Sequence, residues 1–338
     1  MKYKDAGVNI KKADEAVNVI KKHLSLSQPK AADNIGKFAG KFPLGTIRKQ
    51  GSFLYASVDG VGTKTKLIAA TKTYEIAGYD IVAHCVNDLM VQGATPLFFM
   101  DYIAMGHLSV AVIDSLFIGM LKCTKECNIA ILGGETAEMP GIYQNDDFDL
   151  VGFIVGVGNR HRSLPSKITT GNILIGINSS GLHTNGYSLA RKIIDENNLK
   201  LDSYYHTLAD TLRNALMQPH LCYYKILSPL INNKLIQAAA HITGGGIRGN
   251  LIRVLDQHNK AIISKNTWDV PAIFQFIKQN GKVPENEMYA TFNMGLGLIL
   301  IVKEEHIKKC LQLIKNNSFR AYLIGRIEEG ERNVIYEK

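Results

Sequence analysis

The sequence lacks any apolar run long enough to cross a bilayer. Its longest apolar stretch, Met294 to Val302, is broken by glycines, whereas a spanning helix needs about 20 consecutive apolar residues. Residues 1–12, MKYKDAGVNIKK, contain no apolar segment of the kind that a secretory leader carries. We therefore expect a cytoplasmic protein that has no membrane partner.

Cysteine is scarce. The chain has five cysteines, an odd number, at positions 85, 123, 127, 222 and 310. A chain of 338 residues does not need disulfides to build a core, so this usage is typical of a reducing compartment. Cys123 and Cys127 have no second Cys or His pair at zinc-finger spacing. Buried thiols are a better interpretation of this pair than a zinc site.

Dense blocks of one charge are also missing. The formal net charge is +9, yet lysine and arginine are spread along the whole chain and never form a run longer than two. Such a field steers phosphorylated small molecules as readily as it attracts RNA. We therefore expect no nucleic-acid partner.

The composition that remains is that of a folded globular protein, with 46% hydrophobic and 20% charged residues. The length favours two domains. A polar, basic segment that contains Pro165 separates two halves that each mix strands and helices. We predict an α+β (mixed α/β) fold with an N-terminal domain over 1–160, a linker over 161–170 and a C-terminal domain over 171–338.

Hydrophobic periodicity predicts the elements of each half. In the first half we expect helices over 9–24, 79–94 and 109–127, and strands over 53–58, 96–105, 129–134 and 148–158. In the second half we expect strands over 172–178, 261–265, 296–302 and 321–327. Helices are expected over most of 187–256, near 271–279 and over 304–316.

The strand over 53–58 runs into Asp59-Gly60-Val61-Gly62-Thr63-Lys64. Glycine lets backbone N–H groups approach a phosphate, Thr63 and Lys64 add a donor and a charge, and a strand-end Asp59 is a candidate Mg²⁺ ligand. The alternative is a plain hairpin turn. The chain has neither G-x-x-x-x-G-K-[ST] nor G-x-G-x-x-G, which disfavours a P-loop or a Rossmann protein.

Two further carboxylates are candidates for the same metal. In the helix over 79–94, His84, Asp88 and Gln92 form a stripe at i, i+4 and i+8, and short ligand-type side chains there suggest a wet cleft rather than a solvated surface. Glu135 comes directly after the strand over 129–134. Asp59, Asp88 and Glu135 suffice for a nucleotide–metal site if they converge. The alternative for Asp88 is an ordinary solvated helix residue.

In the second half, Ser179 to Ser188 reads SSGLHTNGYS and lies between a strand and a helix. Such a loop offers backbone N–H groups to an anion, and His183 is a candidate for substrate binding or proton transfer. His241 precedes a triple glycine at 244–246 that again leads into a helix. The alternative for both histidines is a purely structural role. The alternative for the three glycines is a simple turn without a ligand.

Taken in order, these motifs resemble the AIR synthetase (phosphoribosylformylglycinamidine cyclo-ligase) family over essentially the whole chain. The resemblance rests on YKDAGV from Tyr3, DGVGTK, CVNDL, QGATPLFFMDY, GGETAEMPG, SSGLHTNGYSL, HITGGG and FNMG. Two segments depart from the family pattern. The loop at 36–40 reads GKFAG where G-G-F-G-G is usual, and Ile247-Arg248-Gly249-Asn250 replaces a stretch that usually contains Pro and Glu.

The resemblance implies a homodimer whose N-terminal sheets form a shared β-barrel. It also implies the reaction of ATP with formylglycinamidine ribonucleotide to give 5-aminoimidazole ribonucleotide, ADP and phosphate. Mg²⁺ would be held by Asp59, Asp88 and Glu135. The nucleotide would contact Lys21 and the loop Gly60, Gly62, Thr63 and Lys64. The substrate would face Gly181, His183 and Asn185, with His241 as a second substrate or proton-transfer residue.

Other enzymes of the same superfamily are the first alternative. Selenophosphate synthetase normally needs a reactive cysteine or selenocysteine near its N-terminus, whereas the first cysteine here is Cys85. Thiamine-monophosphate kinase lacks the SSGLHTNGYS type of loop. A basic RNA-binding protein is a third alternative, which the sequence pI of about 9.1 alone motivates.

Overall fold

The computed structural model describes residues 15, 18–20, 22–23, 52–144 and 146–337. These residues divide into two compact units. One extends to Leu89 and continues from Thr95 to Gly158, and the other comprises Met90–Ala94 and the chain from Asn159 onward. Across the described residues, no helix combines the length and the apolar content that a bilayer crossing demands.

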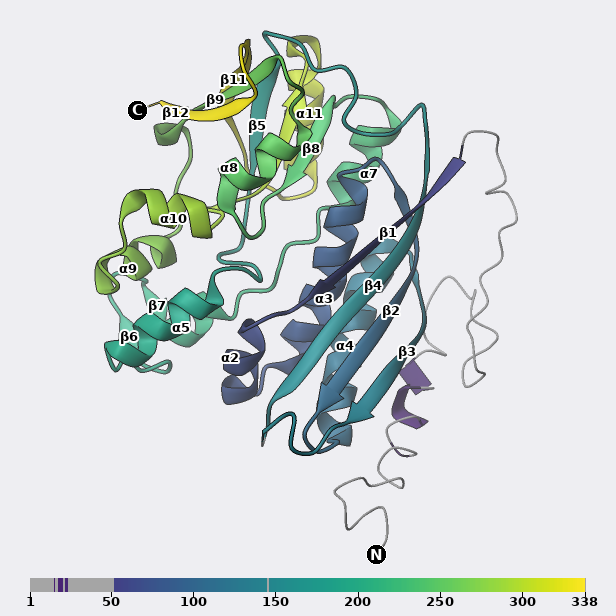
Figure 1. Ribbon diagram of the computed structural model, residues 1–338, viewed down its shortest axis with the longest axis vertical. Helices are drawn as coiled ribbons and strands as arrows, with labels where there is room; N and C mark the ends of the chain where they lie inside the picture. Colours follow the sequence, from purple (N-terminus) through teal and green to yellow (C-terminus); the bar gives the residue numbers. More distant parts are fainter. Residues whose placement is uncertain (1–14, 16–17, 21, 24–51, 145, 338) are drawn as a thin grey trace, which may run out of the picture. The chain divides into compact units, whose positions relative to one another are not determined.

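The first unit is built on a curled four-stranded sheet in the order β1-β4-β2-β3. Its strands are β1 (Ser52–Gly60), β2 (Thr95–Met105), β3 (Ala130–Glu138) and β4 (Phe148–Asn159). β2 pairs parallel with β3 and antiparallel with β4. Its helices are α2 (Lys64–Thr71), α3 (Tyr74–Met90) and α4 (Val110–Cys127), of which α3 and α4 cover one face of the sheet (Figure 1).

The helix layer packs tightly because α3 and α4 cross at glycines. A Cβ atom on Gly78 of α3 would lie 1.9 Å from the carbonyl oxygen of Leu116, and one on Gly119 of α4 would lie 1.9 Å from that of Glu75. The two backbones therefore approach as closely as only glycine allows. Ser109 begins α4 by accepting a hydrogen bond from the Val112 N–H, which satisfies a free donor of its first turn.

The described residues of the predicted first helix, 15, 18–20, 22 and 23, are helical. The Nε2 atom of His23 lies 2.7 Å from Asp114 Oδ1, and the His23 ring stacks on Phe117. Both partners belong to α4, so this segment is attached to the helix layer.

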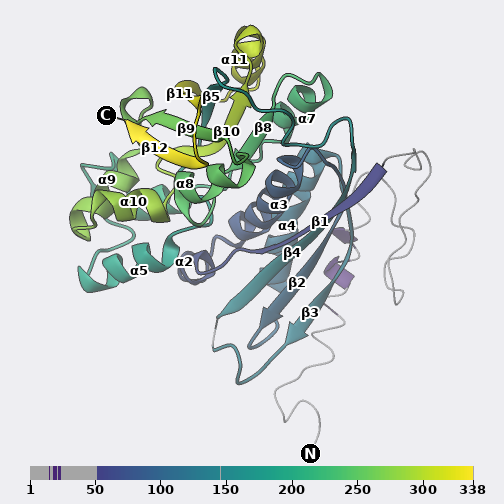
Figure 2. The same cartoon turned by 45° about the horizontal axis from the view of Figure 1, so that its top comes forward.

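The second unit contains a six-stranded sheet in the order β12-β9-β11-β5-β10-β8 (Figure 2). Its strands are β5 (Ile173–Asn178), β8 (Ala238–His241), β9 (Asn259–Ser264), β10 (Leu296–Val302), β11 (Ala321–Glu329) and β12 (Asn333–Glu337). Neighbouring strands of this sheet pair antiparallel, except β12 with β9, which pair parallel. β10 is buried along its whole length, as a central strand covered on both faces should be.

Seven α-helices, three short 3₁₀ helices (η3, Ile252–Val254; η4, Lys265–Thr267; η5, Glu304–His306) and a short hairpin complete the described part of this unit. The α-helices are α5 (Tyr187–Glu196), α6 (Leu212–Leu216), α7 (Tyr224–Asn232), α8 (Gly246–Leu251), α9 (Ala272–Asn280), α10 (Glu285–Thr291) and α11 (Ile307–Asn316). The hairpin pairs β6 (Tyr204–Tyr205) with β7 (Asp210–Thr211).

The mixed α/β architecture agrees with the sequence prediction, and five details correct it. Residues 238–241 form strand β8 inside the region expected to be mainly helical, and β12 and α10 were not expected. The helix expected over 79–94 begins at Tyr74 and ends at Met90. Glu135 lies within β3 rather than after it.

Candidate functional site

The turn that follows β1 is open to solvent at its tip. Gly62 and Thr63 are exposed, and a Cβ atom on Gly62 would have no neighbour within 4 Å. Gly62 has φ +66, a conformation that glycine adopts without strain. Its carbonyl oxygen accepts from the backbone N–H and the hydroxyl of Thr65, 3.1 and 2.8 Å away. This rigid turn at the start of α2 leaves room for a phosphate against the backbone.

Lys64 does not point toward that tip. Its side chain is fully buried, and its Nζ atom lies 2.5 Å from Oδ2 of Asp80, which is buried in α3. A cation held in this way links the start of α2 to α3. The charge that the sequence analysis expected at a phosphate therefore serves packing inside the unit.

The side chains of Asp59 and Asp88 both lie close to the His84 ring. Asp59 is the second-last residue of β1, whereas His84 and Asp88 are four residues apart on one face of α3. The His84 Nε2 atom lies 3.5 Å from Asp59 Oδ1 and 3.8 Å from Asp88 Oδ2. The His84 side chain is 8% exposed, and the two carboxylates are 26% and 31% exposed. Two candidate metal ligands thus lie together at an edge that solvent reaches.

Cys85 is buried in α3 close to these carboxylates. Burial raises the pKa of its thiol well above the usual value, and the charges of Asp59 and Asp88 raise it further. A hydrogen bond from the Asp59 backbone opposes this shift. The thiol therefore stays neutral, and its contact with the Asp59 backbone ties the end of β1 to α3.

Glu135 lies on the other face of the sheet. In β2, Asp101 is paired with Gly134 and Tyr102 with Glu135, and neighbouring residues of a strand point to opposite faces. A Cβ atom on Gly134 would meet the Asp101 side chain, so Asp101 and Gly134 share one face and Glu135 belongs to the opposite one. The three carboxylates therefore do not converge within one chain.

Asp101 is a buried carboxylate within the first unit. It is 7% exposed, and its Oδ2 atom has no hydrogen-bond partner. Burial raises the pKa of this group from 3.8 to about 7, although a hydrogen bond to its own backbone opposes the shift.

In the second unit, hydrogen bonds from buried polar side chains hold the loop after β5 in place. The Ser179 hydroxyl donates to the carbonyl oxygen of Gly181 and lies 3.0 Å from Asn293 Oδ1. Asn293 also donates to the Gly181 carbonyl, 2.8 Å away. The backbone N–H of Ser180 donates to Nε2 of His183, 3.3 Å away. Asn293, from the FNMG motif, thus positions the loop that carries Gly181 and His183.

The two glycine-rich loops of this unit lie side by side. Asn185 Oδ1 would be 3.2 Å from a Cβ atom on Gly244. His183 stacks on His220 with ring centroids 4.0 Å apart, and Nε2 of His220 lies 2.9 Å from Nε2 of His241. The structure therefore brings Gly181, His183, Asn185 and His241 into one region. It adds His220, which the sequence analysis missed because no local pattern marks it.

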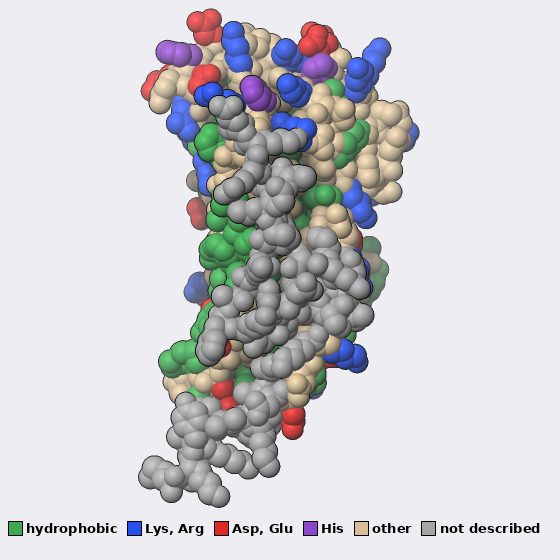
Figure 3. All heavy atoms as spheres, turned by 90° about the vertical axis from the view of Figure 1, so that its right-hand side faces the viewer, with side chains coloured by type: hydrophobic (Ala, Val, Ile, Leu, Met, Phe, Trp, Pro, Cys, Tyr) green, Lys and Arg blue, Asp and Glu red, His purple; other side chains and the backbone are tan. Residues whose placement is uncertain are grey.

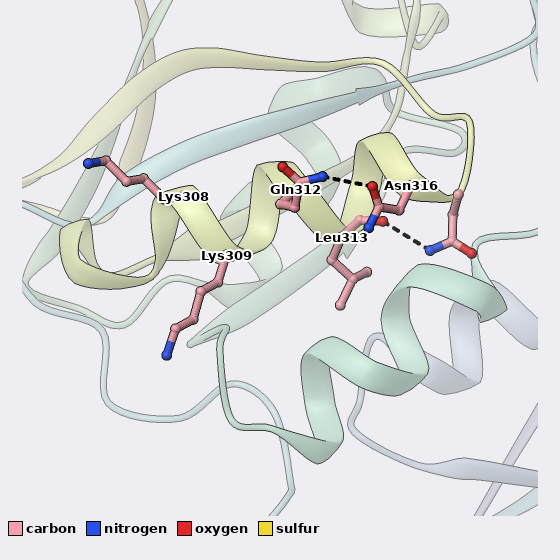
Figure 4. A pocket seen from close by; sticks show the side chains of 6 residues that line it. Lys308, Lys309, Gln312, Leu313 and Asn316 are labelled. Carbon is pink, nitrogen blue, oxygen red and sulfur yellow. Dashed lines mark hydrogen bonds between the residues drawn. The ribbon is translucent and has the colours of Figure 1, made fainter.

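Some predicted site residues fall outside the described part of the chain. Lys21 and the loop over 36–40 belong to this group. In the described part, a hollow of about 470 Å³ lies along α11 and is lined by Lys308, Lys309, Gln312, Leu313, Asn316 and Asn317 (Figure 4). It is open and contains none of the predicted site residues.

Comparison with known proteins matches both halves of the chain to one family. The family described as AIR synthase related protein, N-terminal domain, matches residues 44–158, and its C-terminal counterpart matches residues 169–338. Phosphoribosylformylglycinamidine cyclo-ligase of Oceanobacillus iheyensis is 40% identical over 97% of both chains. The same enzyme of Caldicellulosiruptor bescii is 42% identical over 98% of both.

A solved structure supports the fold. Thiamine-monophosphate kinase from Stenotrophomonas maltophilia superimposes with a TM-score of 0.71 at 16% identity and covers 95% of this chain and 96% of its own. At that identity the likeness concerns the fold alone. The two matched domains and the relatives at 40% identity over nearly the whole length place the chain in the phosphoribosylformylglycinamidine cyclo-ligase, or AIR synthetase, family.

Proposed function

We infer that this protein closes the imidazole ring of purine biosynthesis, converting formylglycinamidine ribonucleotide and ATP into 5-aminoimidazole ribonucleotide, ADP and phosphate. The observation that carries the inference is the full-length relationship to enzymes of this name. Two features of the structure support it. The Asp59–Asp88 pair lies beside an open glycine turn, and a second pair of glycine-rich loops holds His183 and His241.

In the proposed reaction the γ-phosphoryl group of ATP passes to the formyl oxygen of the substrate, which releases ADP. The amidine nitrogen then attacks the activated carbon, the ring closes and phosphate leaves. Little of this chemistry needs a covalent role for the protein, whose task is to position two anionic ligands and to stabilise the transferring charge. Two separate loop systems, one for each ligand, suit this task better than a single nucleophilic side chain does.

We assign the nucleotide side to the N-terminal domain, residues 1–160. Gly60, Gly62 and Thr63 offer their backbone and a hydroxyl to the phosphates at the exposed turn. Asp59 and Asp88 supply the oxygen donors that Mg²⁺ prefers, and both are partly exposed and close to one atom of His84. Bound Mg²⁺ would neutralise phosphate charge there. Lys21 remains a proposed nucleotide contact.

We assign the substrate side to the C-terminal domain, residues 171–338. Gly181, His183 and Asn185 lie on a loop that the Ser179–Asn293 contact holds in shape. His183 is positioned by the Ser180 N–H. A pre-formed loop of donors next to an imidazole suits a ribonucleotide phosphate and a proton transfer. His241, within hydrogen-bond distance of His220, is the proposed second proton-transfer residue.

We also propose that the enzyme is a cytoplasmic homodimer that pairs through the open face of the β1-β4-β2-β3 sheet. That face carries large apolar side chains, among which Leu54 is 66%, Val58 58% and Phe153 37% exposed. Green side chains gather on the side of the molecule seen in Figure 3. Covering such a patch with the curled sheet of a second copy would join the two sheets into a closed barrel. Glu135 would then lie in the interface, where it is available to a site built from both chains.

The test is product formation by purified protein with ATP and Mg²⁺, with and without formylglycinamidine ribonucleotide. ADP is followed by a coupled assay and aminoimidazole ribonucleotide by its diazo colour. We expect both products in equal amounts, and only when the substrate is present. ADP release that ignores the ribonucleotide, or no product from folded protein, would remove this function.

A further inference from the structure

His220 lies on the segment between α6 and α7, and its side chain is fully buried. It therefore offers no surface to a bound ligand. Its ring nonetheless contacts both of the loops that we assign to the substrate. One face stacks on His183, with ring centroids 4.0 Å apart and 23° between the ring planes, and its Nε2 atom lies 2.9 Å from Nε2 of His241.

The contact between His220 and His241 links the protonation of the two rings. A separation of 2.9 Å is that of an ordinary hydrogen bond. A neutral imidazole has one N–H donor and one acceptor nitrogen, so one Nε2 atom donates and the other accepts. When His220 carries its proton on Nε2, a neutral His241 must carry its own on Nδ1, and when His220 carries it on Nδ1 the reverse holds. The tautomer of His220 therefore sets the tautomer of His241.

The second nitrogen of His220 faces the other loop. Its Nδ1 atom lies 3.3 Å from the hydroxyl oxygen of Thr184, the residue that follows His183 in the chain. A hydroxyl group can donate or accept, so Thr184 is compatible with either tautomer of His220. One imidazole thus contacts the His183 loop with its face and one nitrogen, and the His241 loop with its other nitrogen.

The backbone on either side of His220 supports the same loop. The Ser180 hydroxyl donates to the carbonyl oxygen of Pro219, and the Leu221 N–H donates to Nε2 of His183, 3.5 Å away. His183 has φ +62, a left-handed conformation that is uncommon for residues other than glycine. Such a conformation persists where the surrounding contacts hold it. The segment that carries His220 supplies several of these contacts.

We propose that His220 is a positioning residue for ring closure, which orients the His241 imidazole and fixes which of its nitrogens carries the proton. The inference rests on the proposed function and on the proton-transfer role that it gives to His241. A histidine acts as a general base only when its acceptor nitrogen faces the proton to be removed, and as a general acid only when its N–H faces the acceptor. A hydrogen bond to the opposite nitrogen of the ring fixes this choice.

Two amide substitutions separate the hydrogen bond to His241 from the other contacts of the ring. The side-chain nitrogen of glutamine extends about as far as Nε2 of histidine, whereas that of asparagine extends about as far as Nδ1. His220→Gln therefore retains a polar group for His241, and His220→Asn retains one only for Thr184. Both variants lose the stack on His183. His206→Gln is the surface control, because His206 is exposed in the same unit.

The rates are measured on full-length protein as formation of aminoimidazole ribonucleotide, and circular dichroism melting shows whether each variant is folded at the assay temperature. We expect kcat of His220→Asn to lie at least about tenfold below that of His220→Gln, because only the former loses the buried hydrogen bond to His241. The KM values of the two variants for the ribonucleotide should agree within about threefold, since both lose the same stack. His206→Gln should match the parent protein.

Nuclear magnetic resonance of protein labelled with ¹⁵N in its histidines tests the geometry without an activity. We expect a ¹⁵N–¹⁵N coupling through the hydrogen bond between two histidine Nε2 nuclei in the parent protein and in His206→Gln. Both His220 variants should lose it. The parent spectrum answers this question even where a variant is unstable.

The outcomes separate the role of His220 from the proposed function. Equal kcat values in His220→Asn and His220→Gln would overturn the positioning role, because a residue needed only for packing predicts that result. A parent spectrum without the coupling would overturn it as well. No product from folded parent protein that shows the coupling would instead overturn the proposed function, and with it any role of His220 in ring closure.

Discussion

Asp101 should make the stability of the first unit depend on pH. Its carboxyl group is buried and its Oδ2 atom lacks a hydrogen-bond partner, and burial raises its pKa from 3.8 to about 7. The folded state therefore holds a proton between about pH 4 and 7 that the unfolded chain has already released. The free energy of unfolding consequently falls as the pH rises through this window.

The size of the effect follows from the shift. A rise of about 3 pKa units, at about 1.4 kcal/mol each, amounts to about 4 kcal/mol between pH 4 and pH 8. Asp101→Asn has nearly the same shape and cannot ionise. It should remove this slope and leave a constant offset of about 1–3 kcal/mol for the buried amide. The stability of the variant relative to the parent should therefore improve from pH 5 to about pH 7 and level off toward pH 8.

Urea unfolding of both proteins at pH 5, 6, 7 and 8 measures this difference, and ¹³C NMR of the labelled Asp side chains follows the titration directly. Asp101→Glu controls for a general sensitivity of the position while it keeps an ionisable group. A difference in stability that is the same at pH 5 and pH 8, or an Asp101 carbon that titrates near pH 4, would refute the reasoning.

Three further predictions concern the site and its support. Asp88→Asn should fold normally but lose at least about 100-fold in ATP-dependent turnover, measured as ADP release; full activity would remove Asp88 from the metal site. His183→Ala should lower kcat/KM for the ribonucleotide while nucleotide affinity, measured by calorimetry, stays within about threefold; an unchanged kcat/KM would contradict its assignment. Lys64→Met should destabilise the fold by about 3–5 kcal/mol in urea because it leaves Asp80 buried without its cation. A second change, Asp80→Leu, should restore part of this loss, and no loss in the single variant would contradict a packing role.

Most elements could be predicted because their patterns were strong. FLYASV is a short strand-like segment before a turn, LGLILIV is a continuous apolar run typical of a buried strand, and the helix over 109–127 has a helical period and a clear start at the Ser109 cap. Strand β8 was missed because its sequence, AAAH, consists mainly of a residue that favours helices. Its pairing with β10 overrides that local preference, and pairing partners are not visible in a single stretch of sequence.

The candidate site could be predicted only in part, because contacts between distant segments are not visible in a single stretch of sequence. The sequence predicted Asp59 and Asp88 as candidate ligands, and the structure places both near His84. The sequence could not show which face of a strand Glu135 occupies, since a shift of one residue reverses the face. It also could not show that Lys64 forms a buried ion pair with Asp80. His84 was noted only as part of a stripe, and its place between two carboxylates depends on how the end of β1 packs against α3.

The central claim is that ATP activates the formyl oxygen of the substrate for ring closure. The most direct measurement uses formylglycinamidine ribonucleotide labelled with ¹⁸O in its formyl group and analyses the released phosphate by mass spectrometry. The account predicts one ¹⁸O atom in the phosphate for each aminoimidazole ribonucleotide formed. Unlabelled phosphate, with the ¹⁸O recovered in water, would contradict it.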